Sequence, residues 1–295
     1  VDAYFVSQVS NEAFATVILT ETAATIVYAL AIGISIAGMS MVARRIGEKD
    51  PEAAARAAAQ TIIITVIVSV ILSIIGVIFA KDLLFMMGAS EEVAAIGVPY
   101  TQVLLGGNVV IMLLFVLNGI FRGAGDATMA MSSLWIVNGI NIVLDPLLIF
   151  GIGIFPEMGV MGAAIASTIG RGIGVLFQLY ILFNGKRVIK LTKAYFVIQW
   201  GILKKIMNIA TTGAGQYIIS SASWIFLMRI IADFGTDAVN GYGLAVRMII
   251  FTILPAWGIA NAAATLMGQN LGANQPERAA TSVWRSAYYN SAFLS

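Results

Sequence analysis

The 295-residue sequence has no cysteine and no histidine, and only 11% of its residues are charged. The chain therefore forms no disulfide and offers neither a thiolate nor an imidazole to a metal site or a catalytic triad. Soluble globular proteins carry about 25% charged residues. Here 59% of the residues are hydrophobic and the net charge is only +2, which argues against a water-soluble fold and against a nucleic-acid partner. We expect a membrane protein that is not an enzyme.

Long uncharged stretches are abundant, and a helix that crosses a bilayer needs about 20 apolar residues. Two spans are each interrupted by one charge, 127–151 by Asp145 and 159–185 by Arg171. Continuous apolarity without alternation favours helices over a barrel. Residues 1–9 and 279–295 are expected to be parts of two incomplete spans. The uninterrupted stretches are 22–43, 57–80, 93–121, 206–228 and 248–276.

Positive charges concentrate in alternate loops, and such loops are retained in the cytoplasm. The loop 44–56 carries four Lys or Arg residues and the segment 186–205 carries six, whereas 152–158 has none. The first two segments are therefore expected on the cytoplasmic side. Within the second, residues 191–202 mix aromatic side chains with Lys193 and predict either an interfacial helix or an ordinary basic loop.

The sequence also contains an internal repeat. Residues 11–56 align with 236–281 at an offset of 225 without a gap, and eleven of the 46 pairs are identical. Six crossings separate the two copies, so both face the same way, as in transporters built from parallel repeats. The identical pairs include Gly33 with Gly258, Gly47 with Gly272, Pro51 with Pro276 and Glu52 with Glu277.

The fold class expected from this repeat is an all-α polytopic membrane protein. It would contain two parallel six-helix repeats, related by a pseudo-twofold axis along the membrane normal, with the second repeat truncated. The expected domains are an N-lobe over 1–186, a cytoplasmic inter-lobe linker over 187–202 and a partial C-lobe over 203–295.

Carboxylates inside a membrane span are costly and therefore indicate a function. Asp2 and Asp145 qualify, and both are expected about 10 Å below the outer surface. Asn138 and Asn141 precede Asp145 at helical spacing and are expected on the same face, where interhelical bonding is an alternative role. Pro146 would free the carbonyl of the residue one turn before it.

Such a group of oxygens suits a sodium ion held by Asp2, Asn141 and Asp145. Two neighbouring carboxylates would equally favour holding a proton between them. The sequence leaves both coupling ions open.

Several segments together resemble the multidrug and toxic compound extrusion (MATE) transporter family, in its DinF-like branch. The resemblance implies a multi-pass protein of the cytoplasmic membrane that acts as a monomeric antiporter without a cofactor. It would export small organic, often cationic, compounds in exchange for sodium ions or protons. The matching segments are VDAYFVSQVSNEAFAT, GMSMVARRIGEKDPEAA, LNGIFRGAGDATMAM, NIVLDPLLIFG, GVMGAAIASTIGR, GYGLAVRM and LPAWGIANAAATLMGQNLGANQPERA.

The family's coupling residues match Asp2, Asn141 and Asp145, with Thr168 favoured over Ser167 as the hydroxyl of the sixth helix. No acidic residue occurs from 206 to 228, and this absence argues against a cation site in the C-lobe. A lipid-linked-precursor flippase of the same superfamily is the alternative function.

Other polar or helix-bending residues have supporting roles in this interpretation. Arg171 would pair with a carboxylate or stabilise helix packing, and Gln216 and Tyr217 would line a cavity between the lobes. Pro146 and Pro255 would act as hinges for alternating access.

Overall fold

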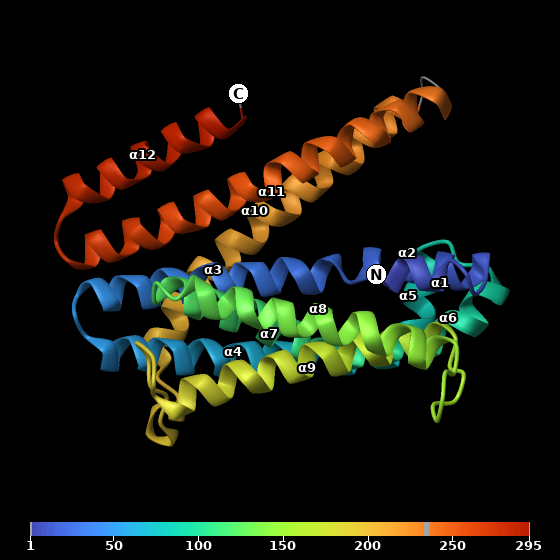
Figure 1. Ribbon diagram of the computed structural model, residues 1–295, viewed down its shortest axis with the longest axis horizontal. Helices are drawn as coiled ribbons and strands as arrows, with labels where there is room; N and C mark the ends of the chain where they lie inside the picture. Colours follow the sequence, from blue (N-terminus) through green and yellow to red (C-terminus); the bar gives the residue numbers. More distant parts are fainter. Residues whose placement is uncertain (1, 233–235, 295) are drawn as a thin grey trace.

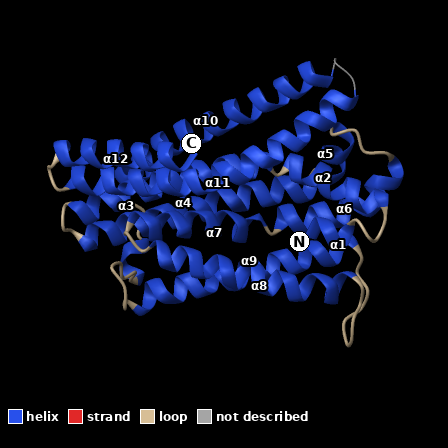
Figure 2. Cartoon of the chain, turned by 45° about the horizontal axis from the view of Figure 1, so that its top comes forward, coloured by secondary structure: helices blue, strands red, loops and turns tan. Residues whose placement is uncertain are grey.

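The computed structural model describes residues 2–232 and 236–294, without the side chains of Asp2, Ala3, Asn11 and several residues between 225 and 247. This part of the chain is helical throughout and contains no strand, which confirms the all-α expectation (Figure 2). The elements are α1 (Asp2–Val6), α2 (Asn11–Ala23), α3 (Thr25–Gly47), α4 (Pro51–Ile78), α5 (Ala80–Met86), α6 (Glu91–Gly106), α7 (Asn108–Gly123), α8 (Ala127–Ile149), α9 (Val160–Asn184), the 3₁₀ turn η1 (Lys193–Phe196), α10 (Trp200–Ala232), α11 (Thr236–Gly272) and α12 (Pro276–Leu294).

Five helices in the described part are long and apolar enough to cross a membrane: α3, α4, α8, α9 and residues 248–272 of α11. The stretch 93–121, expected as one span, lies in α6 and α7, which are long and apolar enough together for one span but are bent by 41° at Gly107. The bend places Gly107 against α9, where a Cβ would lie 2.9 Å from Thr168 Cγ2. The stretch 206–228 lies within α10, which is not among the five.

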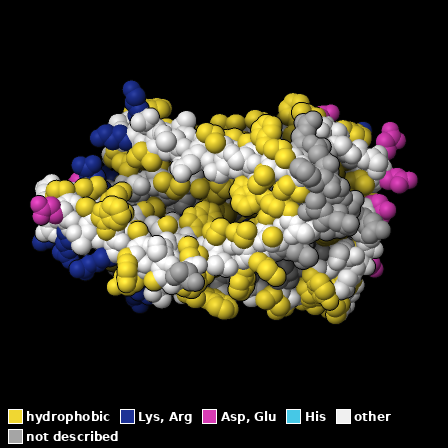
Figure 3. All heavy atoms as spheres, turned by 90° about the horizontal axis from the view of Figure 1, so that it is seen from above, with side chains coloured by type: hydrophobic (Ala, Val, Ile, Leu, Met, Phe, Trp, Pro, Cys, Tyr) yellow, Lys and Arg dark blue, Asp and Glu magenta, His cyan; other side chains and the backbone are white. Residues whose placement is uncertain are grey.

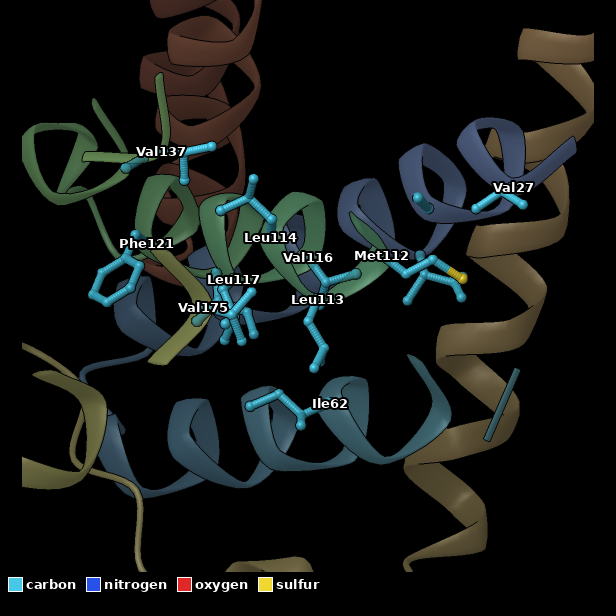
Figure 4. Close-up of a cluster of buried hydrophobic side chains, with 14 of the residues drawn as sticks. Val27, Ile62, Met112, Leu113, Leu114, Val116, Leu117, Phe121, Val137 and Val175 are labelled. Carbon is cyan, nitrogen blue, oxygen red and sulfur yellow. The ribbon is translucent and has the colours of Figure 1, made fainter. Parts of the chain in front are cut away.

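The core of the N-terminal bundle is built around α7. Its side chains Met112, Leu113, Leu117 and Phe121 are buried and meet α3 and α4 on one side and α8 and α9 on the other (Figure 4). Ile62 of α4 lies opposite this row (Figure 4). Dispersion and close packing hold helices together in lipid, where the solvent is as apolar as the side chains.

The paired helices α8 and α9 pack through small residues. A Cβ on Gly162 would lie 2.5 Å from the carbonyl oxygen of Leu148, and one on Gly174 would collide with Val137. Both glycines are buried on α9, together with Ala166 and Gly170 at the same spacing of four residues. Small residues at this spacing let two helix backbones approach closely.

In the view of Figure 3, positive side chains gather at one end of the molecule, together with a few acidic ones, and several acidic side chains mark the other end. We call the first the basic end and define it by Arg44, Arg45, Lys49, Lys204 and Lys205. The turns from α3 to α4 and from α11 to α12 both lie here (Figure 1).

These two turns have the same geometry. Lys49 and Asn274, which are 225 residues apart, are the two non-glycine residues with positive φ in the described chain, at 59° and 56°. Lys49 N donates to Ile46 O at 3.0 Å, and Asn274 N donates to Leu271 O at 3.1 Å. The agreement supports the duplication that the sequence predicts.

The segment between α9 and α10 does not form the interfacial helix that was one of two expectations for 191–202. It contains only η1 before α10 begins at Trp200. The reason is Gln60 of α4, which is fully buried and donates its Nε2 to the carbonyl oxygens of Tyr195 (3.1 Å) and Val197 (2.8 Å). Its Oε1 accepts from Gln199 N at 2.9 Å. One side chain thus satisfies three backbone groups that a helix would have paired internally.

Helices α10 and α11 pack on α3 near the basic end. Toward the opposite end they diverge from α3 (Figure 1). A Cβ on Gly33 of α3 would collide with Ala210 O and lie 2.8 Å from Ala214 N, both in α10. Nearer the end, a Cβ on Gly47 would collide with Gln269 O, and one on Gly272 with Arg44 O.

Candidate functional site

The candidate site lies between α8 and α9, near the end of the molecule opposite the basic end. Asn141 and Asp145 are one turn apart on α8, and Asp145 is fully buried. Asn141 Nδ2 donates to Ser167 Oγ of α9 at 3.0 Å. Gly170 of α9 leaves room for the amide, because a Cβ there would lie 2.5 Å from Asn141 Oδ1. A carboxylate, an amide and a hydroxyl therefore lie together in the packed interior.

Helix α1 packs against the two helices that form this site. It contacts both α8 and α9, and the rings of Phe5 and Phe150 are 6.2 Å apart. Asp2 lies in this helix, but its side chain is outside the described part. The backbone arrangement brings the helices that carry the two predicted acids, Asp2 and Asp145, next to one another.

Asn138 does not share the buried face, contrary to the expectation from its spacing. Its side chain is exposed and donates to Leu134 O of its own helix at 2.8 Å. The buried row on α8 follows a spacing of four residues, through Ser133, Val137, Asn141 and Asp145. This row faces α9, and Asn138 lies about 60° round the helix from Asn141, outside the row.

The hydroxyl brought to Asn141 is that of Ser167 rather than the favoured Thr168. Thr168 is half-buried, and its Oγ1 donates to Ala164 O within α9 at 2.8 Å. Its methyl group faces Gly107 at the bend between α6 and α7. Adjacent residues on a helix point about 100° apart, so only one of the two can face α8.

The supporting residues are more dispersed. Arg171 is half-buried on α9, and its Nη1 has no hydrogen-bond partner among the described residues. Gln216 is exposed on α10, and Tyr217 is half-buried. Both Pro146 and Pro255 lie inside helices, α8 and α11, that continue through them.

The arrangement suits a small cation or a proton. Hard cations prefer several oxygen ligands, and the described site offers the carboxylate of Asp145 with the oxygens of Asn141 and Ser167. An ionised carboxylate inside a membrane is expensive without such a partner. Binding an ion or proton here would therefore change the charge balance between three packed helices.

Sequence reasoning missed a second buried polar group, which joins α7, α8 and α9 closer to the basic end. Gln178 Nε2 donates to Asn118 Oδ1 and to Ser133 Oγ, both at 2.8 Å. All three side chains are buried. Each of these three residues is uncharged and polar and lies inside an apolar stretch. The sequence therefore marks them individually, but it does not show that their helices face one another.

Known proteins are similar to this chain along most of its length. The MatE family model matches residues 1–147 and 213–294. The FAD transporter of Shewanella oneidensis is 28% identical over 283 residues, which are 94% of this chain and 62% of that protein. The "Probable multidrug resistance protein NorM" of Thermotoga maritima is 30% identical over 186 residues, 63% of this chain and 40% of that protein.

One similar solved structure is the outward-facing conformation of a multidrug resistance MATE family transporter of the MOP superfamily. It has a TM-score of 0.88 and 31% sequence identity, and the match covers 98% of this chain and 63% of that one. This chain therefore spans less than two thirds of the length of the relatives it matches.

Proposed function

Because the chain belongs to the MatE family of multi-pass membrane transporters, we propose that the protein exports organic, often cationic, compounds across the cytoplasmic membrane. The export would be driven by sodium ions or protons that move inward, through alternating access of two lobes. Two relatives, NorM of Thermotoga maritima and MepA of Staphylococcus aureus, carry multidrug names, which supports this class of substrate.

The observation that carries the proposal is the buried carboxylate of Asp145. It lies fully enclosed between α8 and α9, one turn from the Asn141–Ser167 hydrogen bond and beside α1. A structural role alone would not need an acid at this depth, because an amide could bond equally well at a lower cost. We assign Asp145, with Asp2, the role of alternately binding and releasing the coupling ion.

The packing at the basic end supports a two-lobe mechanism. Residues 1–186 would form one lobe and 203–295 part of the other, with 187–202 as the linker. The lobes touch through Gly47 and Gly272 at the end that the loop charges assign to the cytoplasm. Access in this conformation would thus be from the outside, and ion binding between α1, α8 and α9 would change the balance with the opposite state.

The test is efflux of a fluorescent cationic dye from cells that express the gene product containing this chain. Asp145→Asn and Asp2→Asn are each expected to reduce efflux at least tenfold and to abolish its dependence on sodium or pH. The matched control is Asn138→Ala, at an exposed position of the same helix, which should leave efflux within twofold of the parent. Unchanged efflux and ion dependence in both aspartate variants would show that the coupling assignment is wrong.

A second candidate substrate is a flavin nucleotide, because the relative matched over 94% of this chain is named as an FAD transporter. FAD is an anion, whereas the proposed drug substrates are cations. Competition distinguishes them: excess FAD supplied inside dye-loaded membrane vesicles would slow dye efflux only if both share one path. Export of FAD without export of any cationic dye would replace the drug-efflux proposal.

A further inference from the structure

A cavity of about 500 Å³ lies at the basic end between α3, α10 and α11. Its polar wall carries three cationic side chains, Arg44, Arg45 and Lys205, and one acid, Glu48. Three positive charges and one negative charge leave a net charge of +2 in the lining. The cavity has no part in the candidate coupling site, which lies near the other end of the bundle.

The acid does not neutralise this wall. Arg44 Nε donates to Glu48 Oε1 at 3.3 Å and Arg45 bonds to Oε2, so one carboxylate is shared by two guanidinium groups. Lys205 forms no ion pair with any described residue. The side chain of Arg44 is also 69% exposed and is therefore accessible to a ligand. The lining is therefore complementary to an anion.

The rest of the lining includes apolar side chains. Met41 and Ile209 lie on the same two helices as the cations, and Met267 and Leu271 of α11 are 41% and 44% exposed. A ligand that fits both kinds of lining carries a phosphate-like anion on one end and a hydrocarbon chain on the other. The loop charges place this end at the cytoplasmic face, where anionic lipids bind in basic pockets between helices.

We propose that the cavity binds an anionic phospholipid of the cytoplasmic leaflet, with its phosphodiester on Arg44, Arg45 and Lys205. The acyl chains would lie along Met267 and Leu271. Because the lining comes from α3, α10 and α11, the lipid bridges helices that meet at Gly47 and Gly268. Bound lipid consequently stabilises the arrangement in which the basic end is closed.

The experiment measures binding of dioleoyl phosphatidylglycerol to the protein in neutral detergent micelles, by native mass spectrometry and by the rise in Tm. Arg44→Gln and Lys205→Gln are each expected to weaken binding about fivefold, as expected for one charge at a membrane surface. Glu48→Gln should strengthen it severalfold, because it removes the competing carboxylate. Lys81→Gln, a cation on α5 at the other end, is the matched control and should change nothing.

The outcomes separate the possible sources of the anion. Equal affinity for phosphatidylcholine, or unchanged binding in both cation variants, overturns the proposal. Glycerol 3-phosphate or FAD binding as tightly as the lipid overturns the lipid assignment in favour of a soluble phosphate ester. If a cation variant does not fold, the increase expected for Glu48→Gln still decides. No ion gradient is present, so this result is independent of whether the protein exports drugs.

Discussion

At the scale of single residues, the candidate site depends on Gly170, which leaves room for the side-chain amide of Asn141. Gly170 is buried on α9 directly against Asn141 Oδ1, while the amide nitrogen of Asn141 donates to Ser167. A side chain at residue 170 would push Asn141 away from the position in which its amide nitrogen reaches Ser167. Close packing transmits such a displacement, because interiors have few voids to absorb it.

We therefore expect Gly170→Ala to destabilise the protein by about 2 kcal/mol, the range for overpacking a well-filled interior. The measurement is Tm in detergent, which should fall by several degrees. The control is Gly172→Ala, two residues further along α9, where the new Cβ would meet only Val110 Cγ1 at 3.8 Å. That variant should be neutral or slightly stabilised, because alanine is the better helix former. Equal losses in both would refute the packing argument.

Sequence reasoning identified Asn141 and Asp145 because polar residues are rare inside apolar stretches and therefore conspicuous. It could not separate Ser167 from Thr168, or place Asn138 correctly, because the direction of a helix face depends on which neighbour it packs against. The buried row on α8 is set by α9, and the glycines of α9 permit that contact. Spacing alone contains no information on the partner helix.

At the scale of elements, the connection between α9 and α10 is fixed by a side chain of α4. Gln60 forms three hydrogen bonds to the backbone of residues 195–199. Each such bond contributes about 1 kcal/mol net. The linker is thus held against the N-terminal bundle at one place, between segments that are 135 or more residues apart in the sequence.

Gln60→Met is expected to release this connection. Trypsin should then cleave after Lys193 on the order of a hundredfold faster under native conditions, since the loss of three bonds makes local opening less costly by about 3 kcal/mol. The control is Gln178→Met, which removes an equally buried glutamine that bonds to Asn118 and Ser133 instead. This second variant should lower Tm without changing the rate of cleavage at Lys193. Cleavage that is unaffected by Gln60→Met would mean that other contacts hold the linker.

Most helices were predictable from the sequence, because an uninterrupted apolar stretch of about 20 residues is the length that a membrane-spanning helix requires. The division of 93–121 at Gly107 was not, since the bend arises where Gly107 meets Thr168 of another helix. The 3₁₀ turn at Lys193 was equally hidden, because its cause is a residue more than 130 positions earlier in the chain. Local patterns predict elements well and fail where a distant side chain decides.

At the scale of the whole molecule, the contact at the basic end follows the internal repeat. Gly47 meets Gln269, and Gly272 meets Arg44; each glycine and each partner is 225 residues from its counterpart. This is the reciprocal pattern that a twofold axis imposes on an interface. Elsewhere the two copies cannot be compared: Gly33 packs on Ala210 and Ala214 of α10, and positions 225 residues before these two fall outside the sequence.

This reciprocal glycine contact yields the most discriminating prediction. A methyl group at Gly47 or Gly272 would collide with a backbone oxygen of the other helix, which cannot yield like a flexible side chain. Gly47→Ala and Gly272→Ala should therefore separate α3 from α11 and favour the state in which the basic end is open. The same substitution at Gly258 is the control, because no described residue lies within 4 Å of a Cβ there.

The distance between spin labels attached through Glu52→Cys and Glu277→Cys reports this change, because the chain has no cysteine of its own and both sites are exposed. These two residues follow the facing ends of α3 and α11, so opening at this end lengthens their separation directly. We expect a longer or broader distribution in Gly47→Ala and Gly272→Ala and the parent distribution in Gly258→Ala. Identical distributions in all four proteins would mean that the glycine contact does not hold the basic end closed. A shift in Gly258→Ala alone would contradict the assignment of the repeat contacts.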